Sequence, residues 1–95
     1  MDMSGKVVLI TGASRGIGAA AARAFAGSGA KVALLARSTG EIETLAAEIG
    51  ANAIALPCDV SNYDDVCDAV AKTESAFGPL DVLIGNAGLL DPISH

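Results

Sequence analysis

A glycine-rich turn between an apolar run and an alanine-rich segment constrains the fold of this chain more than any other feature. Residues 6–10 read K-V-V-L-I, a continuous apolar run that is typical of a strand buried on both faces of a parallel sheet. The turn reads T-G-A-S-R-G-I-G over residues 11–18, and a helix is predicted over residues 18–26. A strand, a glycine turn and a helix in this order form an anion site, because the first N–H groups of the helix point at the ligand.

The spacing of the glycines is G-x-x-x-G-x-G, counted from Gly12. Gly12 lies where the chain must turn sharply after the strand, while Gly16 and Gly18 lack side chains where backbone approaches a pyrophosphate and the helix packs on the strand. A P-loop would need Gly-Lys-Ser/Thr, but Ile17 follows Gly16, so ATPase chemistry is not expected. On this motif alone, the alternative that the glycines serve only tight packing stays open.

The rest of the chain repeats the alternation of strands and helices. Strands are predicted over residues 31–36, 53–56 and 81–84, and the helices between them end at Gly50 and at Gly78-Pro79. The order β-α-β-α-β-α-β with short connections predicts an α/β fold, a Rossmann-type doubly wound parallel sheet with strand order 3-2-1-4. At 95 residues, the chain is predicted to form one domain.

The two later helices show capping signals and apolar stripes. Ser38 with Glu41, and Ser61 with Asp64, match the capping box, in which a cap side chain and an acid three residues later bind each other's backbone. The predicted inner faces follow helical spacing: Ile42, Leu45, Ala46 and Ile49 in one helix, and Val66, Ala69, Val70 and Thr73 in the other.

Composition and charge exclude several classes of partner. The net charge is −5 and the six Lys and Arg residues are scattered, so no nucleic acid is expected as a partner. No apolar stretch approaches a membrane span, and residues 1–6 lack the cationic start of a signal peptide. Cys58 and Cys67 match no common metal or redox spacing and are interpreted as buried thiols. We therefore expect a soluble, cytoplasmic protein without a metal site.

Four stretches, taken together, resemble one protein family. They are Gly5-Lys6 before the first strand, the glycine turn, C-D-V-S from Cys58 and N-A-G from Asn86. In this order and spacing, the chain resembles the N-terminal portion of the short-chain dehydrogenase/reductase family. The resemblance implies a nicotinamide dinucleotide as cofactor and hydride exchange with a small-molecule alcohol or carbonyl substrate. Gly85 stands where the family usually has Asn. In the family, that Asn side chain helps to hold the central strands together, so this contribution is in doubt here.

The resemblance also implies which residues contact the cofactor. The pyrophosphate and the adenine ribose would lie along the three glycines of the turn, Gly12, Gly16 and Gly18. They would also lie along Ser14, Arg15 and Ile17. Asp59 would accept a hydrogen bond from the adenine amino group, and the backbone of Val60 would flank the ring. The residues beside the cofactor ribose would be Asn86, Ala87 and Gly88. A turn role alone is the open alternative for Asp59 and Asn86.

The end of the second strand indicates NADP rather than NAD. Dinucleotide folds that bind NAD carry an acid there for the ribose 2′-hydroxyl, but this chain reads Ala36-Arg37-Ser38 and has no carboxylate until Glu41. A guanidinium pairs with a 2′-phosphate through charge-assisted, often bidentate bonds, so Arg37, with Ser38 beside it, favours NADP(H). Arg15 can approach the same phosphate. The alternative for Arg37 is a solvated residue that precedes a helix.

No catalytic residues are predicted within the chain. The family's Tyr, with a Lys four residues later, and its Ser and Asn would lie beyond His95, while Tyr63 is followed four residues later by Cys67. Two interpretations stay open: a fragment of an NADP-dependent reductase, inactive by itself, or a complete non-catalytic module that binds NADP(H) or senses redox state. The aperiodic residues 89–95 favour the fragment. The native protein is expected to be a homo-oligomer, and the isolated chain is expected to associate through the edge of its fourth strand.

Overall fold

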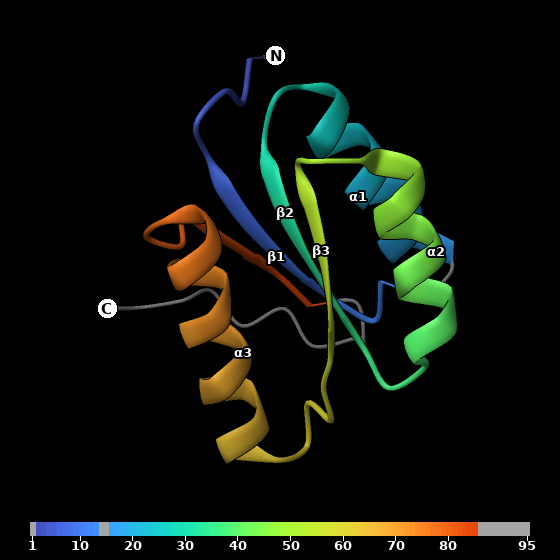
Figure 1. The fold of residues 1–95 in the computed structure, drawn as a ribbon, viewed down its shortest axis with the longest axis vertical. Coiled ribbons are helices and arrows are strands. Elements are labelled where there is room, and N and C mark those ends of the chain that lie inside the picture. Colours follow the sequence, from blue (N-terminus) through green and yellow to red (C-terminus); the bar gives the residue numbers. More distant parts are fainter. Residues whose placement is uncertain (1, 14–15, 86–95) are drawn as a thin grey trace.

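A parallel sheet with helices on both faces forms the part of the chain that the computed structural model describes, residues 2–13 and 16–85 (Figure 1). The elements follow one another as β1 (Val7–Thr11), α1 (Gly16–Gly27), β2 (Lys31–Ala36), α2 (Thr39–Ile49), β3 (Ala53–Pro57), α3 (Tyr63–Phe77) and β4 (Val82–Ile84). The four strands of this part are ordered β3-β2-β1-β4. The predicted α/β fold and strand order are confirmed.

The central strands β1 and β2 are buried on both faces, which explains their unbroken apolar sequence. Val8 of β1 lies opposite Val32 of β2 and Val82 of β4, and all strand pairs are parallel. Alternate side chains belong to two separate cores. Val8 and Ile10 of β1 belong to one cluster, together with Val32 and Leu34 of β2. Leu9 of β1 belongs to the other, together with Ala33 and Leu35 of β2.

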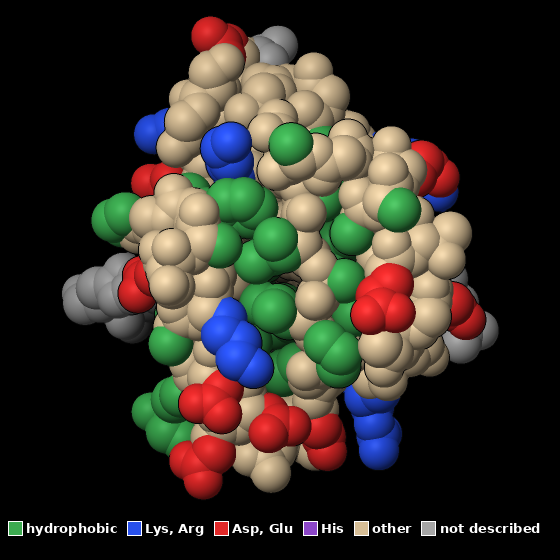
Figure 2. Space-filling model, in the orientation of Figure 1, with side chains coloured by type: hydrophobic (Ala, Val, Ile, Leu, Met, Phe, Trp, Pro, Cys, Tyr) green, Lys and Arg blue, Asp and Glu red, His purple; other side chains and the backbone are tan. Residues whose placement is uncertain are grey.

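The helices cover the two faces unequally. In Figure 1, α1 and α2 lie on one side of the sheet and α3 lies alone on the other. The predicted stripe of α2 packs on the first core, with Ile42 and Leu45 fully or almost fully buried. On the other face, Ala69 and Thr73 of α3 are buried, but apolar side chains of the edge strand β3 are only half-buried. Figure 2 shows such apolar side chains gathered around β3.

The capping predictions need correction in two places. Ser38 is the N-cap residue of α2, as predicted, but its side chain makes no cap hydrogen bond. The N-cap residue of α3 is Asn62 rather than Ser61, and Asn62 Oδ1 accepts from the backbone N–H of Asp65 at 3.1 Å. Ser61 is one residue too early because its hydroxyl and its N–H bind Asp59 instead.

The two cysteines differ in burial. Cys58 is buried at the end of β3, as predicted, whereas Cys67 is exposed on α3, so the prediction of two buried thiols is wrong for Cys67. The side chain of Tyr63 is 80% exposed in the first turn of α3. Among the described residues, no helix has the length and apolar character needed to cross a membrane.

Candidate functional site

A pocket lies where β1, β2 and β3 reach their carboxyl ends. Its volume is about 240 Å³, and its lining consists of Thr11, Gly12, Ala36, Arg37, Ser38, Cys58 and Val60. Parallel strands bring these ends to one edge of the sheet, and open α/β sheets bind ligands in the crevice outside that edge. Four of the predicted cofactor residues, Gly12, Arg37, Ser38 and Val60, therefore meet in one pocket.

The glycine turn has the backbone that the sequence pattern predicts. Gly12 has φ 62° and Gly16 has φ 63°, in the left-handed region where a side chain strains the backbone. The buried Ala13 donates its N–H to the carbonyl of Leu35 at 3.2 Å, so the turn is held against β2. Because α1 begins at Gly16, the first N–H groups of the helix follow directly on this turn.

Arg37 supplies a positive charge at the rim of this pocket. Its side chain is exposed directly after β2, and it forms no ion pair with any residue in the described part of the chain. Its charge lies close enough to Asp59 to lower the pKa of that carboxyl. The rim is therefore suited to an anionic group.

Asp59 is held in its ionised form beside the pocket. Its Oδ1 accepts from the hydroxyl of Ser61 at 2.6 Å and from the N–H of Ser61 at 3.0 Å. The side-chain bond, then the backbone bond, and then the charge of Arg37 lower the pKa of Asp59 below its ordinary value. An ionised carboxylate accepts hydrogen bonds and donates none, so Asp59 is suited to an amino group.

Three lining residues were missed at the sequence level: Thr11, Ala36 and Cys58. Each lies at or next to the last residue of its strand, so the rule that ligands bind at the carboxyl ends of parallel strands could have found them. Cys58 is 4% exposed, and burial, followed by the charges of Asp65 and Asp59, raises the pKa of its thiol. It therefore lines the pocket as a neutral, weakly polar wall.

The other predicted cofactor residues fall into two groups: some are described but do not line this pocket, and the others lie outside the described part of the chain. Gly16, Ile17 and Gly18 belong to the first turn of α1, where Gly18 is buried and Ile17 is 78% exposed. The predicted cofactor residues outside the described part of the chain are Ser14, Arg15, Asn86, Ala87 and Gly88.

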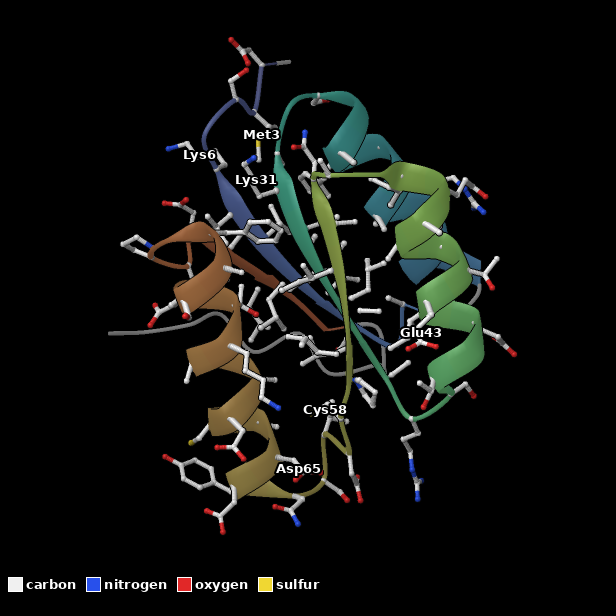
Figure 3. The ribbon with its side chains drawn as sticks, viewed as in Figure 1. Met3, Lys6, Lys31, Glu43, Cys58 and Asp65 are labelled. Atoms are coloured by element: carbon white, nitrogen blue, oxygen red, sulfur yellow. The ribbon has the colours of Figure 1, made fainter. Side chains whose placement is uncertain are left out.

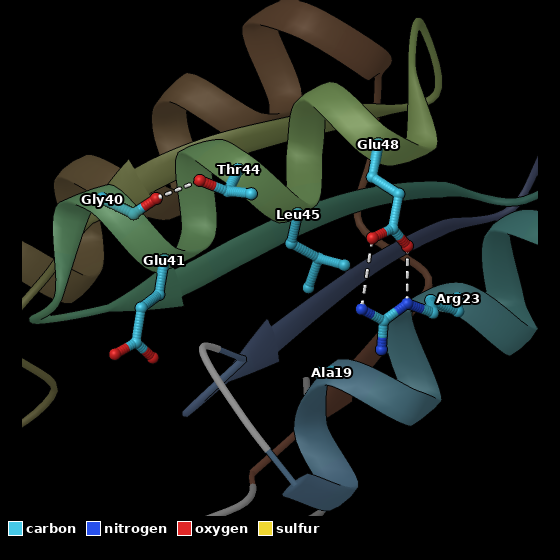
Figure 4. A pocket seen from close by; sticks show the side chains of 7 residues that line it. All are labelled: Ala19, Arg23, Gly40, Glu41, Thr44, Leu45 and Glu48. Atoms are coloured by element: carbon cyan, nitrogen blue, oxygen red, sulfur yellow. Dashed lines mark hydrogen bonds and ion pairs between the residues drawn. The ribbon is translucent and has the colours of Figure 1, made fainter.

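A larger hollow of about 630 Å³ lies between α1 and α2 (Figure 4). Arg23 spans it and binds Glu48 through two hydrogen bonds, of 2.6 and 3.3 Å, with both side chains about half exposed. The guanidinium is thereby already paired with a carboxylate. The hollow is lined by residues of the two helices alone, whereas the smaller pocket is lined by the residues at the strand ends, so the smaller pocket is the candidate site.

A sequence model of the family described as short chain dehydrogenase matches residues 6–95, nearly the whole chain. The chain belongs to the short-chain dehydrogenase/reductase family. Its extent corresponds to the N-terminal portion of family members. The chain therefore corresponds to the N-terminal cofactor-binding region of a short-chain dehydrogenase/reductase.

Individual relatives agree in sequence and in structure. Short-chain dehydrogenase reductase 3c of Arabidopsis thaliana is 44% identical over 94 residues, which are 98% of this chain and 36% of that protein. Tropinone reductase-like 1 of Erythroxylum coca is 39% identical over 89 residues, 94% of this chain and 33% of that protein. A 3-ketoacyl-(acyl-carrier-protein) reductase from Brucella melitensis, crystallised with NADH, superposes with a TM-score of 0.84 at 44% identity, over 86% of this chain and 34% of that one. The chain thus spans about a third of the length of these relatives.

Proposed function

We propose that this chain binds NADP(H) in preference to NAD(H), as the cofactor-binding portion of an oxidoreductase. The whole protein would transfer hydride between that cofactor and an alcohol or carbonyl substrate. The observation that carries the cofactor preference is the exposed guanidinium of Arg37 on the rim of the pocket, unpaired with any acid among the described residues.

The end of β2 lacks the group that an NAD site uses. Ala36, small and apolar, lines the pocket there, and the first carboxylate after it, Glu41, belongs to α2. A carboxylate in place of Ala36 would repel a 2′-phosphate, whereas Arg37 attracts it. One hydrogen bond to a charged group contributes roughly 1.5–3 kcal/mol, enough for about tenfold discrimination or more.

Val60 and the neighbouring Asp59 suit the adenine base. Val60, 44% exposed, offers an apolar surface beside the pocket, and the ionised Asp59 next to it accepts a hydrogen bond from an amino group. The glycine turn, with Gly12 and Gly16 at positive φ, leads into the N-terminus of α1, which favours the pyrophosphate.

The described residues bind and orient the cofactor, and the nicotinamide, when bound, supplies the hydride chemistry. Tyr63 is followed four residues later by Cys67 rather than by Lys, and its side chain is almost fully exposed. We therefore propose that the 95-residue chain binds the dinucleotide without catalysing hydride transfer.

Cofactor titration tests the preference. NADPH and NADH are titrated by calorimetry into the wild-type chain and into Arg37→Ala, with Lys6→Ala as a control that removes one positive charge at the opposite end of the sheet (Figure 3). The wild type should bind NADPH about tenfold more tightly or better, Arg37→Ala should lose that preference, and Lys6→Ala should keep it. Equal wild-type affinities, or an Arg37→Ala chain that keeps its preference, would sink the assignment.

A further inference from the structure

The loop between β3 and α3 is tied to the first turn of α3 by its backbone. The N–H of Asp59 donates to Asp65 Oδ2 at 3.3 Å, and the carbonyl of Asp59 accepts from the N–H of Asn62 at 2.9 Å. Figure 3 places Asp65 at the start of α3, near the loop that follows Cys58. Both backbone polar groups of Asp59 are therefore bonded to residues at the start of one helix.

The bond made by Asp65 departs from an ordinary capping box. In that motif, the acid three residues after the cap returns to the N–H of the cap residue itself. Here Asn62 Oδ1 caps the helix by accepting from the N–H of Asp65, but the N–H of Asn62 is already used by Asp59. The Asp65 carboxylate reaches past the cap to Asp59, so its hydrogen bond fixes the loop rather than the end of the helix.

A second set of bonds orients the Asp59 side chain. Both bonds from Ser61 go to Oδ1, and Oδ2 accepts no hydrogen bond from any described residue. With the backbone of Asp59 held by Asp65 and Oδ1 held by Ser61, Oδ2 is the oxygen that remains for a ligand. Val60, the next residue, lines the pocket.

We propose that Asp65 is a positioning residue for recognition of the cofactor base. By holding the peptide of Asp59, it places Asp59 Oδ2 to accept a hydrogen bond from a 6-amino purine and to repel a 6-oxo purine. This inference rests on the proposed function, in which Asp59 contacts the adenine of the dinucleotide.

Asp64 provides a matched comparison for Asp65. Both carboxylates lie in the first turn of α3, where a negative charge stabilises the positive end of the helix. Asp64, however, makes no hydrogen bond within the described part of the chain, whereas Asp65 binds Asp59. A difference between substitutions at the two sites therefore reports the hydrogen bond rather than the charge.

The test compares two cofactors that differ only in the base. Affinities for NADPH and for its hypoxanthine analogue are measured by calorimetry for the wild type and for Asp59→Ala, Asp65→Ala, Asp65→Asn and Asp64→Ala. We expect roughly tenfold or greater preference for adenine in the wild type and in Asp64→Ala, and none in Asp59→Ala. Asp65→Ala should lose most of the preference for adenine. Asp65→Asn keeps an acceptor oxygen and should therefore show a preference close to that of the wild type. A general weakening of the fold would lower both affinities together and leave their ratio unchanged.

The outcomes separate this inference from the function on which it rests. A wild-type chain that binds neither dinucleotide overturns both proposals. If the wild type prefers adenine but Asp65→Ala keeps the full preference, or Asp65→Asn fails to restore it, the role of Asp65 alone is overturned. Should Asp65→Ala not fold, Asp65→Glu replaces it, since Glu keeps the charge but moves the carboxylate by one methylene, and an unchanged preference there counts against the inference.

Discussion

The ionisation of Asp59 depends on a single neighbour, Ser61, more than on any other group. The hydroxyl of Ser61 is the largest cause of the lowered pKa of Asp59, followed by its N–H. A carboxyl whose pKa is lower in the folded than in the unfolded chain contributes stability above its unfolded pKa, and this contribution is lost as the pH falls through the folded pKa. The Asp59 carboxylate is therefore kept ionised to a lower pH than an ordinary aspartate.

Replacement of Ser61 should return the pKa of Asp59 toward the ordinary aspartate value. Ser61→Ala removes the hydroxyl donor and leaves the backbone donor, so we expect a partial rise of the pKa, measured by carbon NMR of the carboxyl group during an acid titration. Ser4→Ala is the control, because the side chain of Ser4 is the largest cause of the lowered pKa of Asp2, followed by the N–H of Ser4, which donates to Asp2 Oδ1 at 2.8 Å. That variant should move Asp2 and leave Asp59 unchanged. An Asp59 titration that is identical in Ser61→Ala and the wild type would contradict this account.

The ends of the two later helices are capped to different degrees. Asn62 binds the N–H of Asp65 at the start of α3, whereas Ser38 holds the cap position of α2 without a side-chain bond. We expect Asn62→Ala to lower the free energy of unfolding by about 1 kcal/mol and Ser38→Ala to change it much less. Urea unfolding of both variants measures the difference. Equal losses would mean that the cap of α3 contributes nothing specific.

The sequence predicted every helix and strand of the described chain, because apolar runs and glycine stops are local signals. The cap of α3 was one residue off for a physical reason. Ser61 and Asn62 are both good cap residues with an acid three positions later, and only the bonds between Ser61 and Asp59 decide between them. Local pattern contains no information about such a competition.

The exposure of Cys67 and the lining of the pocket show two further limits of prediction from the sequence. Cys67 is two residues before the buried Ala69, roughly 200° away around the helix, so helical geometry predicts its exposure once the inner face is known. Thr11 and Ala36, by contrast, are small residues without charge or motif, and only the meeting of strand ends in space identifies them as lining residues. Gly12 could be predicted from the sharp turn of the backbone and Arg37 from its charge. Val60 could be predicted from the C-D-V-S motif.

The two faces of the sheet differ in how completely the described chain covers them. Two helices pack on the first core, and α3 alone packs on the second, where Ile54 and Leu56 of β3 stay half-buried. β4 is short and is fixed to β1 at its start by two further bonds: Asp81 Oδ2 accepts from the N–H of Val7 at 2.8 Å, and the N–H of Asp81 donates to the carbonyl of Val7 at 2.9 Å. β4 is thus held firmly to β1, whereas the edge strand β3 keeps half-buried apolar side chains.

The edge of β4, which no described strand covers, predicts self-association of the 95-residue chain. β4 pairs with β1, and no strand among the described residues pairs with its other edge, where half-buried apolar residues lie. Exposed strand edges bind other strands through unpaired backbone groups. The net charge of −5 opposes this contact at low ionic strength, so added salt should strengthen it by screening the repulsion. Light scattering over a concentration series, at low and moderate salt, should show a mass that rises with concentration and more steeply with salt. A constant monomer mass in both conditions would show that this edge is not available to a second chain.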